Sequence, residues 1–291
     1  MSSSASSEET TISKFGKSFA SGFISSAVGK YVSHPLDTIK MRIQISGTKQ
    51  PLNYHFTNII TNEGFGGFFK GAVSPVLGTA PIMATLFASN DFAKRNLAQT
   101  QLPVFWKEFL PGCWAGFSTL LFVIPTDLIK IKKQGVHNRV VSYSEVLKTI
   151  LEIDGILGLY RGFWISFIRF VPQYGIHFYS YEKLKQAFGT SATCPPSTST
   201  SSMYTNFTKM ISGGVAGQIC CLIGYPVDVV RTYILYHPEH RSITKTIMYL
   251  YQNYGVGYFH RGWSVAMGKS FVNGAVTFSL YEVINAYLLS E

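Results

Sequence analysis

The stretch SHPLDTIKMRIQ, residues 33–44, follows an apolar run, breaks at a proline and then alternates charged with apolar residues. Two later stretches repeat this pattern, IPTDLIKIKKQ at 124–134 and YPVDVVRTYIL at 225–235. Their prolines, Pro35, Pro125 and Pro226, are spaced 90 and 101 residues apart. Because a fixed period is the signature of a repeat architecture, we interpret the chain as three copies of one unit.

A second signature follows each proline and supports the repeat. The segments EGFGGFFKG, DGILGLYRG and YGVGYFHRG end at Gly71, Gly162 and Gly262, which are 91 and 100 residues apart. A segment rich in Ser, Thr and Pro accounts for the longer last interval. We expect a disordered tail at 1–13, repeats at 14–98, 104–188 and 204–291, and a flexible linker at 189–203.

Each repeat holds two apolar stretches separated by a polar segment. A stretch of about twenty apolar residues spans a bilayer core as a helix, so three repeats predict six transmembrane helices. Only 14% of the residues are charged, which is low for a soluble domain. The sequence therefore predicts an all-α membrane protein built from three pseudo-symmetric two-helix repeats. Small residues four apart favour close helix contacts and occur as Gly22/Ser26, Gly112/Gly116 and Gly213/Gly217.

The net charge of +10 and the four cysteines narrow the function. The bases form no block with interleaved aromatic residues, so we expect no nucleic-acid partner. The cysteines show no CxxC pair, and we expect neither a metal site nor a cofactor. Neither a phosphate-binding loop, an HExxH helix nor a GxSxG motif occurs, so an enzyme is not expected. The segments 40–70, 130–161 and 231–261 hold 14 of the 25 Lys and Arg residues, which predicts that they face the more negative compartment.

Each proline is followed by an acid and a base three residues apart. A proline inside a helix kinks the axis, so three kinks would swing three helix ends toward one centre. One such motif would indicate a local helix pair worth a few tenths of a kcal/mol. Three at matched positions favour a ring in which the acid of one helix meets the base of the next. The ring residues are Asp37, Lys40, Asp127, Lys130, Asp228 and Arg231.

A weaker set of charges lies near the end of each repeat. The segments NDFAK, YEKLK and YEVIN predict a second ring at the opposite end of the cavity. Two rings suit alternating access, because partly hydrated ion pairs contribute about 1 kcal/mol each and substrate binding can offset that cost. The second ring would contain Asp91, Lys94, Glu182, Lys185 and Glu282, with Asn285 in place of a third base.

With these motifs the chain resembles the mitochondrial carrier family over nearly its whole length. The family pattern, Pro-x-Asp/Glu-x-x-Lys/Arg-x-Lys/Arg with a glutamine beyond, is complete in the first two repeats. Those residues are Pro35, Asp37, Lys40, Arg42 and Gln44, then Pro125, Asp127, Lys130, Lys132 and Gln134. The third repeat departs, because Tyr233 and Leu235 replace the second base and the glutamine, and Tyr254 replaces the acid of the later signature.

The resemblance implies a monomeric six-helix barrel in the mitochondrial inner membrane. The post-proline loops, each with a short helix, would lie in the matrix, and both termini would face the intermembrane space. The family also binds cardiolipin where a helix opens after a glycine, since exposed amides suit a phosphate. The corresponding residues are Lys70, Gly71, Arg161, Gly162, Arg261 and Gly262. The three bases could instead be interfacial residues that snorkel toward the headgroups.

Offsets of 7, 11 and 15 from each helix-opening glycine share one helical face. They fall on Arg169, Gln173 and His177, on Lys269, Asn273 and Thr277, and on Gly78, Ile82 and Leu86. In the carrier family, offset 7 on the fourth and sixth helices belongs to the substrate contact points. We expect Arg169 and Lys269 to hold a carboxylate, and the Ile82/Leu86 wall to take an apolar portion. Alternatively, the two cations only keep the lumen hydrated. Lys30 and His34 could line the same cavity.

Within the family, the sequence motifs of this chain look most like those of carnitine/acylcarnitine and ornithine-type carriers. Those relatives place an acid beside the fourth-helix arginine, where this chain has Phe170. We therefore expect a solute carrier for a small carboxylate-bearing metabolite, such as an amino acid, a carnitine ester or a related anion. The alternative is a carrier fold that has lost transport and serves as a structural subunit docked to a respiratory complex. The altered third repeat motivates that alternative.

Overall fold

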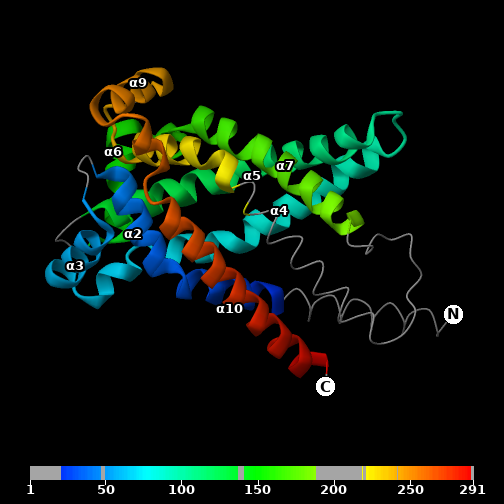
Figure 1. Cartoon of the computed structure of the whole chain (residues 1–291), viewed down its shortest axis with the longest axis horizontal. Helices are drawn as coiled ribbons and strands as arrows, with labels where there is room; N and C mark the ends of the chain where they lie inside the picture. The colour runs from blue at the N-terminus through cyan, green and yellow to red at the C-terminus, as the bar shows by residue number, and fades with distance from the viewer. Residues whose placement is uncertain are drawn as a thin grey trace.

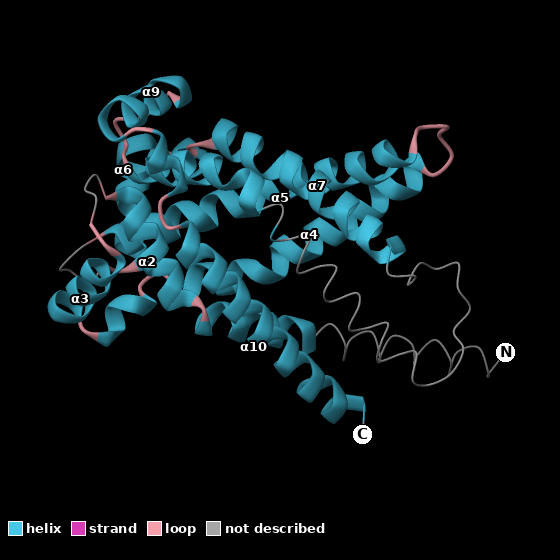
Figure 2. Ribbon diagram, viewed as in Figure 1, coloured by secondary structure: helices cyan, strands magenta, loops and turns pink. Residues whose placement is uncertain are grey.

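The computed structural model describes residues 21–46, 50–136, 141–187, 218, 221–240 and 242–289. Within these ranges the secondary structure is helical and no strand is present (Figure 2). The expected tail at 1–13 and linker at 189–203 lie outside the described residues. The all-α prediction is confirmed.

Each repeat follows the same order of elements: a long helix, a short α-helix, a 3₁₀ helix and a second long helix. The first repeat has a helix at 21–32, α2 (His34–Ile45), α3 (Leu52–Glu63), η1 (Phe65–Phe69) and α4 (Val73–Leu97). The second has α5 (Val104–Gly135), α6 (Tyr143–Asp154), η2 (Ile156–Tyr160) and α7 (Phe163–Ala187). The third has a helix at 221–236, α9 (Ile243–Tyr254), η3 (Val256–His260) and α10 (Trp263–Leu289).

The glycines of the second signature bracket each 3₁₀ helix. Gly64, Gly155 and Gly255 precede it with φ of 68°, 65° and 73°. Gly71, Gly162 and Gly262 follow it with φ of 82°, 74° and 75°. Residues that carry a side chain rarely adopt a positive φ, so glycine is required at both turns. The repeated signature therefore encodes one turn geometry used three times.

The three prolines differ in their effect on the helix. Pro35 lies in the first turn of α2. Ser33 separates α2 from the preceding helix at 21–32. Pro125 lies inside α5, and Pro226 lies inside the helix at 221–236. Within the described residues, an interruption of the helix beside the proline is thus visible in the first repeat, and the kink expected at each proline stays a prediction. The other two helices absorb the lost hydrogen bond without an interruption.

Small residues set the closest helix contacts. A Cβ atom on Gly112 would lie 2.6 Å from the Tyr174 carbonyl oxygen, and one on Gly116 would lie 3.0 Å from that of Phe170. This glycine pair therefore lets α5 pack directly against the backbone of α7, as expected from its spacing. A Cβ atom on Gly22 would meet no atom of the described residues within 4 Å, so within that part of the chain the spacing alone did not ensure a contact.

Two helical segments of the described chain are long and apolar enough to cross a membrane, Phe65–Leu97 and Val104–Gly135. The other long helices carry charged or polar residues that lower their hydropathy, such as Arg169 in α7 and Lys269 in α10. Large apolar side chains such as Phe271, which is 78% exposed, cover the outside of the bundle. Such an exposed apolar surface suits contact with lipid.

The short helices α3, α6 and α9 gather at one end of the molecule (Figure 1). We call it the short-helix end. Each of the three buried apolar clusters lies there, where the residues after a proline meet a short helix; one joins Val229 and Val230 to Leu250 and Tyr258. The buried apolar clusters at the short-helix end therefore hold the charged proline motifs in position.

Candidate functional site

Three ion pairs link the three repeats in a closed cycle. Lys40 Nζ lies 2.5 Å from Asp228 Oδ2, and Arg231 Nη2 lies 2.9 Å from Asp127 Oδ2. Lys130 and Asp37 form the third pair. Each pair joins a base to an acid of another repeat, as the matched motifs led us to expect. We call these six residues the aspartate ring.

Two further bases, one from α7 and one from α10, contact aspartates of the aspartate ring. Lys269 Nζ lies 2.7 Å from Asp37 Oδ1, and Arg169 Nε lies 3.4 Å from Asp228 Oδ1. These are the two residues predicted to hold a substrate carboxylate. The structure therefore places both of them on carboxylates that the chain itself provides.

The aspartate ring forms part of the wall of a cavity of about 270 Å³. Among the described residues, five bases and three acids line it, which leaves an excess of two positive charges in this part of the chain. Phe170 also lines the cavity, and the guanidinium of Arg231 lies 4.9 Å from the centre of its ring. An excess of buried positive charge favours a negatively charged ligand. The charged lining residues are Asp37, Asp127, Asp228, Lys40, Lys130, Arg169, Arg231 and Lys269.

The two glutamines beyond the ring also join repeats. Gln44 Nε2 donates to the Tyr225 hydroxyl at 3.2 Å, and Gln134 Nε2 donates to Thr38 Oγ1 at 3.1 Å. Gln134 also lies 3.2 Å from the ring nitrogen of His34. These contacts tie the first repeat to the third and to the second. At the matching position of the third repeat, Leu235 is fully buried and packs beside Gly162.

The remaining residues predicted to bind substrate do not line this cavity. Lys30 donates to Thr79 Oγ1 at 2.9 Å, and His34 lies 3.0 Å from the Lys70 carbonyl oxygen. Gln173 bonds to Arg169 on the next turn of α7. Asn273 and Thr277 face Gly29, at the contact between α10 and the helix at 21–32. Of the others, Leu86 is buried, Ile82 lies beside Gly78 and His177 lies beside Phe178.

At the opposite end, the second ring is described only in part. Lys94 Nζ lies 3.9 Å from Glu182 Oε1 but 2.5 Å from Glu108 Oε2. Asp91 pairs with Arg95 on its own exposed helix face, at 3.8 Å, and with no base of another repeat among the side chains that the structure describes. The side chains of Lys185 and Glu282 lie outside the described part of the chain. Sequence reasoning missed Glu108, because no motif marks the start of α5.

The second base of each proline motif connects differently in the three repeats. In the first, Glu63 accepts from Arg42 at 2.8 Å and from Lys70 at 2.6 Å. Burial raises the pKa of Glu63, but these two cations outweigh burial and lower it from its ordinary value. In the second repeat, Lys132 donates instead to the Tyr236 carbonyl at 2.7 Å, and Asp154 pairs with Arg161.

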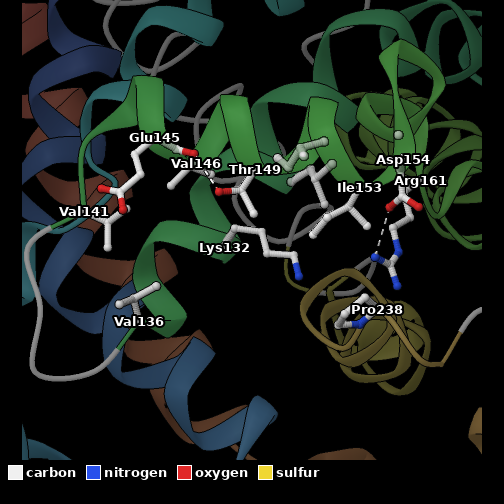
Figure 3. Close-up of a pocket in the computed structure, with 13 residues that line it drawn as sticks. Lys132, Val136, Val141, Glu145, Val146, Thr149, Ile153, Asp154, Arg161 and Pro238 are labelled. Carbon is white, nitrogen blue, oxygen red and sulfur yellow. Dashed lines mark hydrogen bonds and ion pairs between the residues drawn. The ribbon is translucent and has the colours of Figure 1, made fainter.

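Figure 3 shows this region of the second repeat, where Lys132, Asp154 and Arg161 line a separate cavity between α6 and Pro238. In the third repeat, an aromatic cluster replaces the ion pair. Tyr254 stacks on Tyr258 at 4.9 Å, and Tyr258 lies edge-on to Tyr233 at 6.4 Å. The departures seen in the sequence therefore keep the short helix attached by apolar contact instead of charge.

The base before each helix-opening glycine reaches into the following repeat. Lys70 donates to the Val136 carbonyl at 3.4 Å, Arg161 to that of His237 at 3.0 Å, and Arg261 to that of Ser46 at 3.1 Å. Each acceptor lies at the C-terminal end of a long helix, where unsatisfied carbonyls favour a cation. The side chains of Lys70 and Arg161 are only 10% and 11% exposed, which argues against the snorkelling alternative.

Comparison with known proteins agrees with this architecture. A family model described as mitochondrial carrier protein matches residues 12–101, 102–192 and 202–291. The chain is 28% identical to human solute carrier family 25 member 45, with 91% of this chain and 96% of that protein covered. It is 28% identical to the rat mitochondrial basic amino acids transporter, over 94% and 90% of the two chains. It is 30% identical to mitochondrial substrate carrier family protein S of Dictyostelium discoideum, over 92% and 96%.

Proposed function

The chain belongs to the mitochondrial carrier family, whose members are transporters and not enzymes, and from this premise we propose that it carries a small carboxylate-bearing metabolite across the mitochondrial inner membrane. The observation that supports the proposal best is the aspartate ring at one end of a cavity whose wall includes Arg169 and Lys269. A closed ring stops passage at one end, while two bases offer a site for an anion.

The aspartate ring acts as the gate on the matrix side. Its three pairs hold the repeats together at the short-helix end, and Lys94 and Glu182 at the opposite end are 3.9 Å apart. In the proposed cycle this arrangement is the state closed toward the matrix, in which Lys94 of the second gate lies nearer to Glu108 than to Glu182. Partly exposed ion pairs are worth about 1 kcal/mol each, so the binding energy of a small solute suffices to shift the balance.

The second gate consists of Asp91, Lys94, Glu182, Lys185 and Glu282. It closes when the first gate opens, and Lys94, which lies 2.5 Å from Glu108 and 3.9 Å from Glu182 in this structure, then shortens its contact with Glu182. Such reciprocal closure gives alternating access, and we propose that the protein uses it as an exchanger that carries one solute in each direction. The asymmetry between the two ends supports this assignment.

The solute carries at least one carboxylate. Arg169 and Lys269 supply the charge to bind it, and the cavity has an excess of positive charge. The similarity to a protein named as a basic amino acids transporter favours an amino acid among the candidate solutes. No cofactor takes part in this cycle.

Cardiolipin binds where a positive-φ glycine opens α4, α7 and α10. Gly71, Gly162 and Gly262 turn the backbone at the starts of these helices, and a helix N-terminus attracts phosphate. The protein works as a monomer with the short helices in the matrix and both termini in the intermembrane space. Lys70, Arg161 and Arg261 position these turns through their carbonyl contacts.

Reconstitution into proteoliposomes tests the function directly. Purified protein in cardiolipin-containing vesicles should exchange a labelled carboxylate for internal unlabelled solute. Comigration with respiratory complexes on a native gel, together with no uptake from a broad panel of carboxylates, amino acids and acylcarnitines, would favour the structural-subunit alternative. The inter-repeat pairs of Asp228 and Arg231 favour transport, because the altered third repeat still completes the aspartate ring.

A further inference from the structure

We propose that the separate cavity between α6 and Pro238 is a second ligand site, and that it binds a small aromatic carboxylate. Its lining residues come from α5, α6, the segment 158–161 and the turn at Pro238, as Figure 3 shows. They include none of the residues that line the cavity at the aspartate ring. The inference therefore goes beyond the proposed transport function and does not depend on it.

The cavity occupies the place at which the third repeat packs tyrosines. Positions are matched between repeats by counting from the proline and from the helix-opening glycine. Lys132 lies seven residues after Pro125, as Tyr233 does after Pro226. The other matches, counted back from Gly162 and Gly262, are Thr149 with Tyr249, Asp154 with Tyr254 and Gly158 with Tyr258. All four matched residues of the second repeat line the cavity.

The four tyrosines of the third repeat form one aromatic cluster. The ring of Tyr254 lies 4.9 Å from that of Tyr258, and the ring of Tyr249 lies 6.4 Å from those of Tyr233 and Tyr254. The matched residues of the second repeat carry no aromatic ring, and a cavity of about 270 Å³ lies there. This volume is just below the usual range for ligand pockets, about 300–1,000 Å³, so the ligand is small.

The first repeat closes the matching place with charge. Its matched residues, Arg42 and Glu63, lie 2.8 Å apart, and their side chains are only 1% and 3% exposed. In the second repeat Lys132 donates instead to the Tyr236 carbonyl, and Asp154 pairs with Arg161 at 3.5 Å. The ion pair that closes this place in the first repeat is therefore not formed by Lys132 and Asp154.

An aromatic ring in this cavity would lie against a guanidinium. In the third repeat the guanidinium carbon of Arg261 lies 4.9 Å from the centre of the Tyr258 ring. Arg161 holds the matching position in the second repeat and lines the cavity, where Gly158 brings no ring. A ligand ring in the place of Tyr258 would make the same contact, because the face of an aromatic ring attracts a cation.

Lys132 provides the partner for the carboxylate. Its ammonium has three donors, and among the described residues one of them meets the Tyr236 carbonyl at 2.7 Å. At this end of the cavity Lys132 and Arg161 face Asp154, while Figure 3 shows Glu145 at the opposite end. One negative charge on the ligand balances two bases and one acid. The aliphatic residues that line the rest are Leu128, Val136, Val141, Val146, Ile150 and Ile153.

Ligand-observed NMR on the detergent-solubilised full-length protein tests the site. Benzoate is compared with cyclohexanecarboxylate, which keeps the charge without the aromatic ring, and with benzamide, which keeps the ring without the charge. Benzoate should bind at least about threefold more tightly than either of the others, since both the ring and the charge contribute. Equal affinity for all three probes, or no binding of benzoate, would overturn the proposal.

Thr149→Tyr and Thr149→Val form a matched pair of variants. The tyrosine introduces the side chain that the third repeat has at Tyr249, and it should weaken benzoate binding by about tenfold or more because it occupies the cavity. Valine keeps the volume of threonine and should bind benzoate as the wild type does. Thr149 is exposed, so both variants should fold.

Lys132→Gln gives an independent measurement on the same cavity. It should weaken the binding of benzoate and leave that of benzamide unchanged, because only the charged probe uses the ammonium. Unchanged affinity for benzoate in both Thr149→Tyr and Lys132→Gln would show that benzoate binds elsewhere.

The double variant Arg169→Gln/Lys269→Gln separates this site from solute transport. Its changes lie in the other cavity, so benzoate binding should persist while solute exchange is lost. Loss of benzoate binding in this variant would place benzoate at the aspartate ring and overturn the second site. Benzoate binding by a wild type that exchanges no solute would support the second site and remove the proposed function.

Discussion

Lys40 of the first repeat and Asp228 of the third lie 2.5 Å apart across 188 residues of sequence. This contact closes the cycle that Asp37–Lys130 and Asp127–Arg231 begin. Local pairing within one motif, such as Asp37 with Lys40, is not found among the described residues. The charges of the proline motifs therefore connect repeats instead of stabilising single helices.

Replacement of Glu63 by Gln should destabilise the protein by about 3 kcal/mol at pH 7, because it leaves Arg42 and Lys70 buried without their shared carboxylate. The pKa of Glu63 lies below its ordinary value of 4.5, so its contribution is complete above about pH 4.5. As the pH falls through the lowered pKa, that contribution is lost. Thermal unfolding of the wild type and of Glu63→Gln between pH 3.5 and 7.5 measures the contribution of Glu63 to stability.

The difference in free energy of unfolding between the wild type and Glu63→Gln should therefore become smaller as the pH falls below about 4.5. Glu152→Gln serves as the control, because Glu152 is exposed and pairs only along its own helix with Lys148. It should change stability by no more than about 0.5 kcal/mol. A gap for Glu63→Gln that stayed constant down to pH 3.5 would speak against the buried ion pair.

Replacement of Gly112 by Ala should destabilise the bundle by about 1–3 kcal/mol, since the new Cβ would meet the backbone of α7 at 2.6 Å. Gly22→Ala is the matched control, because a Cβ there has no neighbour within 4 Å among the described residues and alanine favours the helix. Melting temperatures of the two variants in the same detergent should move in opposite directions. Equal shifts would show that the close approach of α5 and α7 does not limit packing.

Replacement of Gly262 by Ala should weaken lipid binding at the start of α10. Alanine at a φ of 75° costs about 1–2 kcal/mol, so the turn relaxes and its amides move away from the phosphate. The increase in melting temperature on adding cardiolipin should be smaller than in the wild type. Gly257→Ala lies in the preceding 3₁₀ helix η3, has no positive φ and would meet no described atom within 4 Å, so it should retain the full increase. An identical cardiolipin response in both variants would contradict the lipid site.

The sequence predicted the repeat and the aspartate ring because both depend on spacing. Matched offsets from Pro35, Pro125 and Pro226 place acids and bases at one depth whatever the surrounding side chains. The walls of the cavity were less predictable. Helical periodicity assigns Asn273 and Thr277 to the face of Lys269, but the packing of α10 on Gly29 turns these two residues into a helix contact.

Partners that lie outside a motif could not be predicted. Glu108 holds Lys94 because α5 packs beside α4, and no repeat spacing marks that acid. The sequence likewise showed that Tyr233 and Tyr254 had replaced charges, but not that they join an aromatic cluster with Tyr258. Identity of side chains fixes what a site can do, whereas tertiary packing decides which of them meet.

The pair Asp127–Arg231 offers the most direct test of the ring as a gate, because Asp127 has no second base to replace its partner among the described residues. Exchange of labelled solute is measured for Asp127→Arg, Arg231→Asp and the double variant in proteoliposomes. Each single substitution should reduce exchange at least tenfold, and reversing both charges should restore it to within about threefold of the wild type. Single variants that exchange at the wild-type rate, or a folded double variant no better than either single one, would contradict a gate formed by ion pairs between repeats.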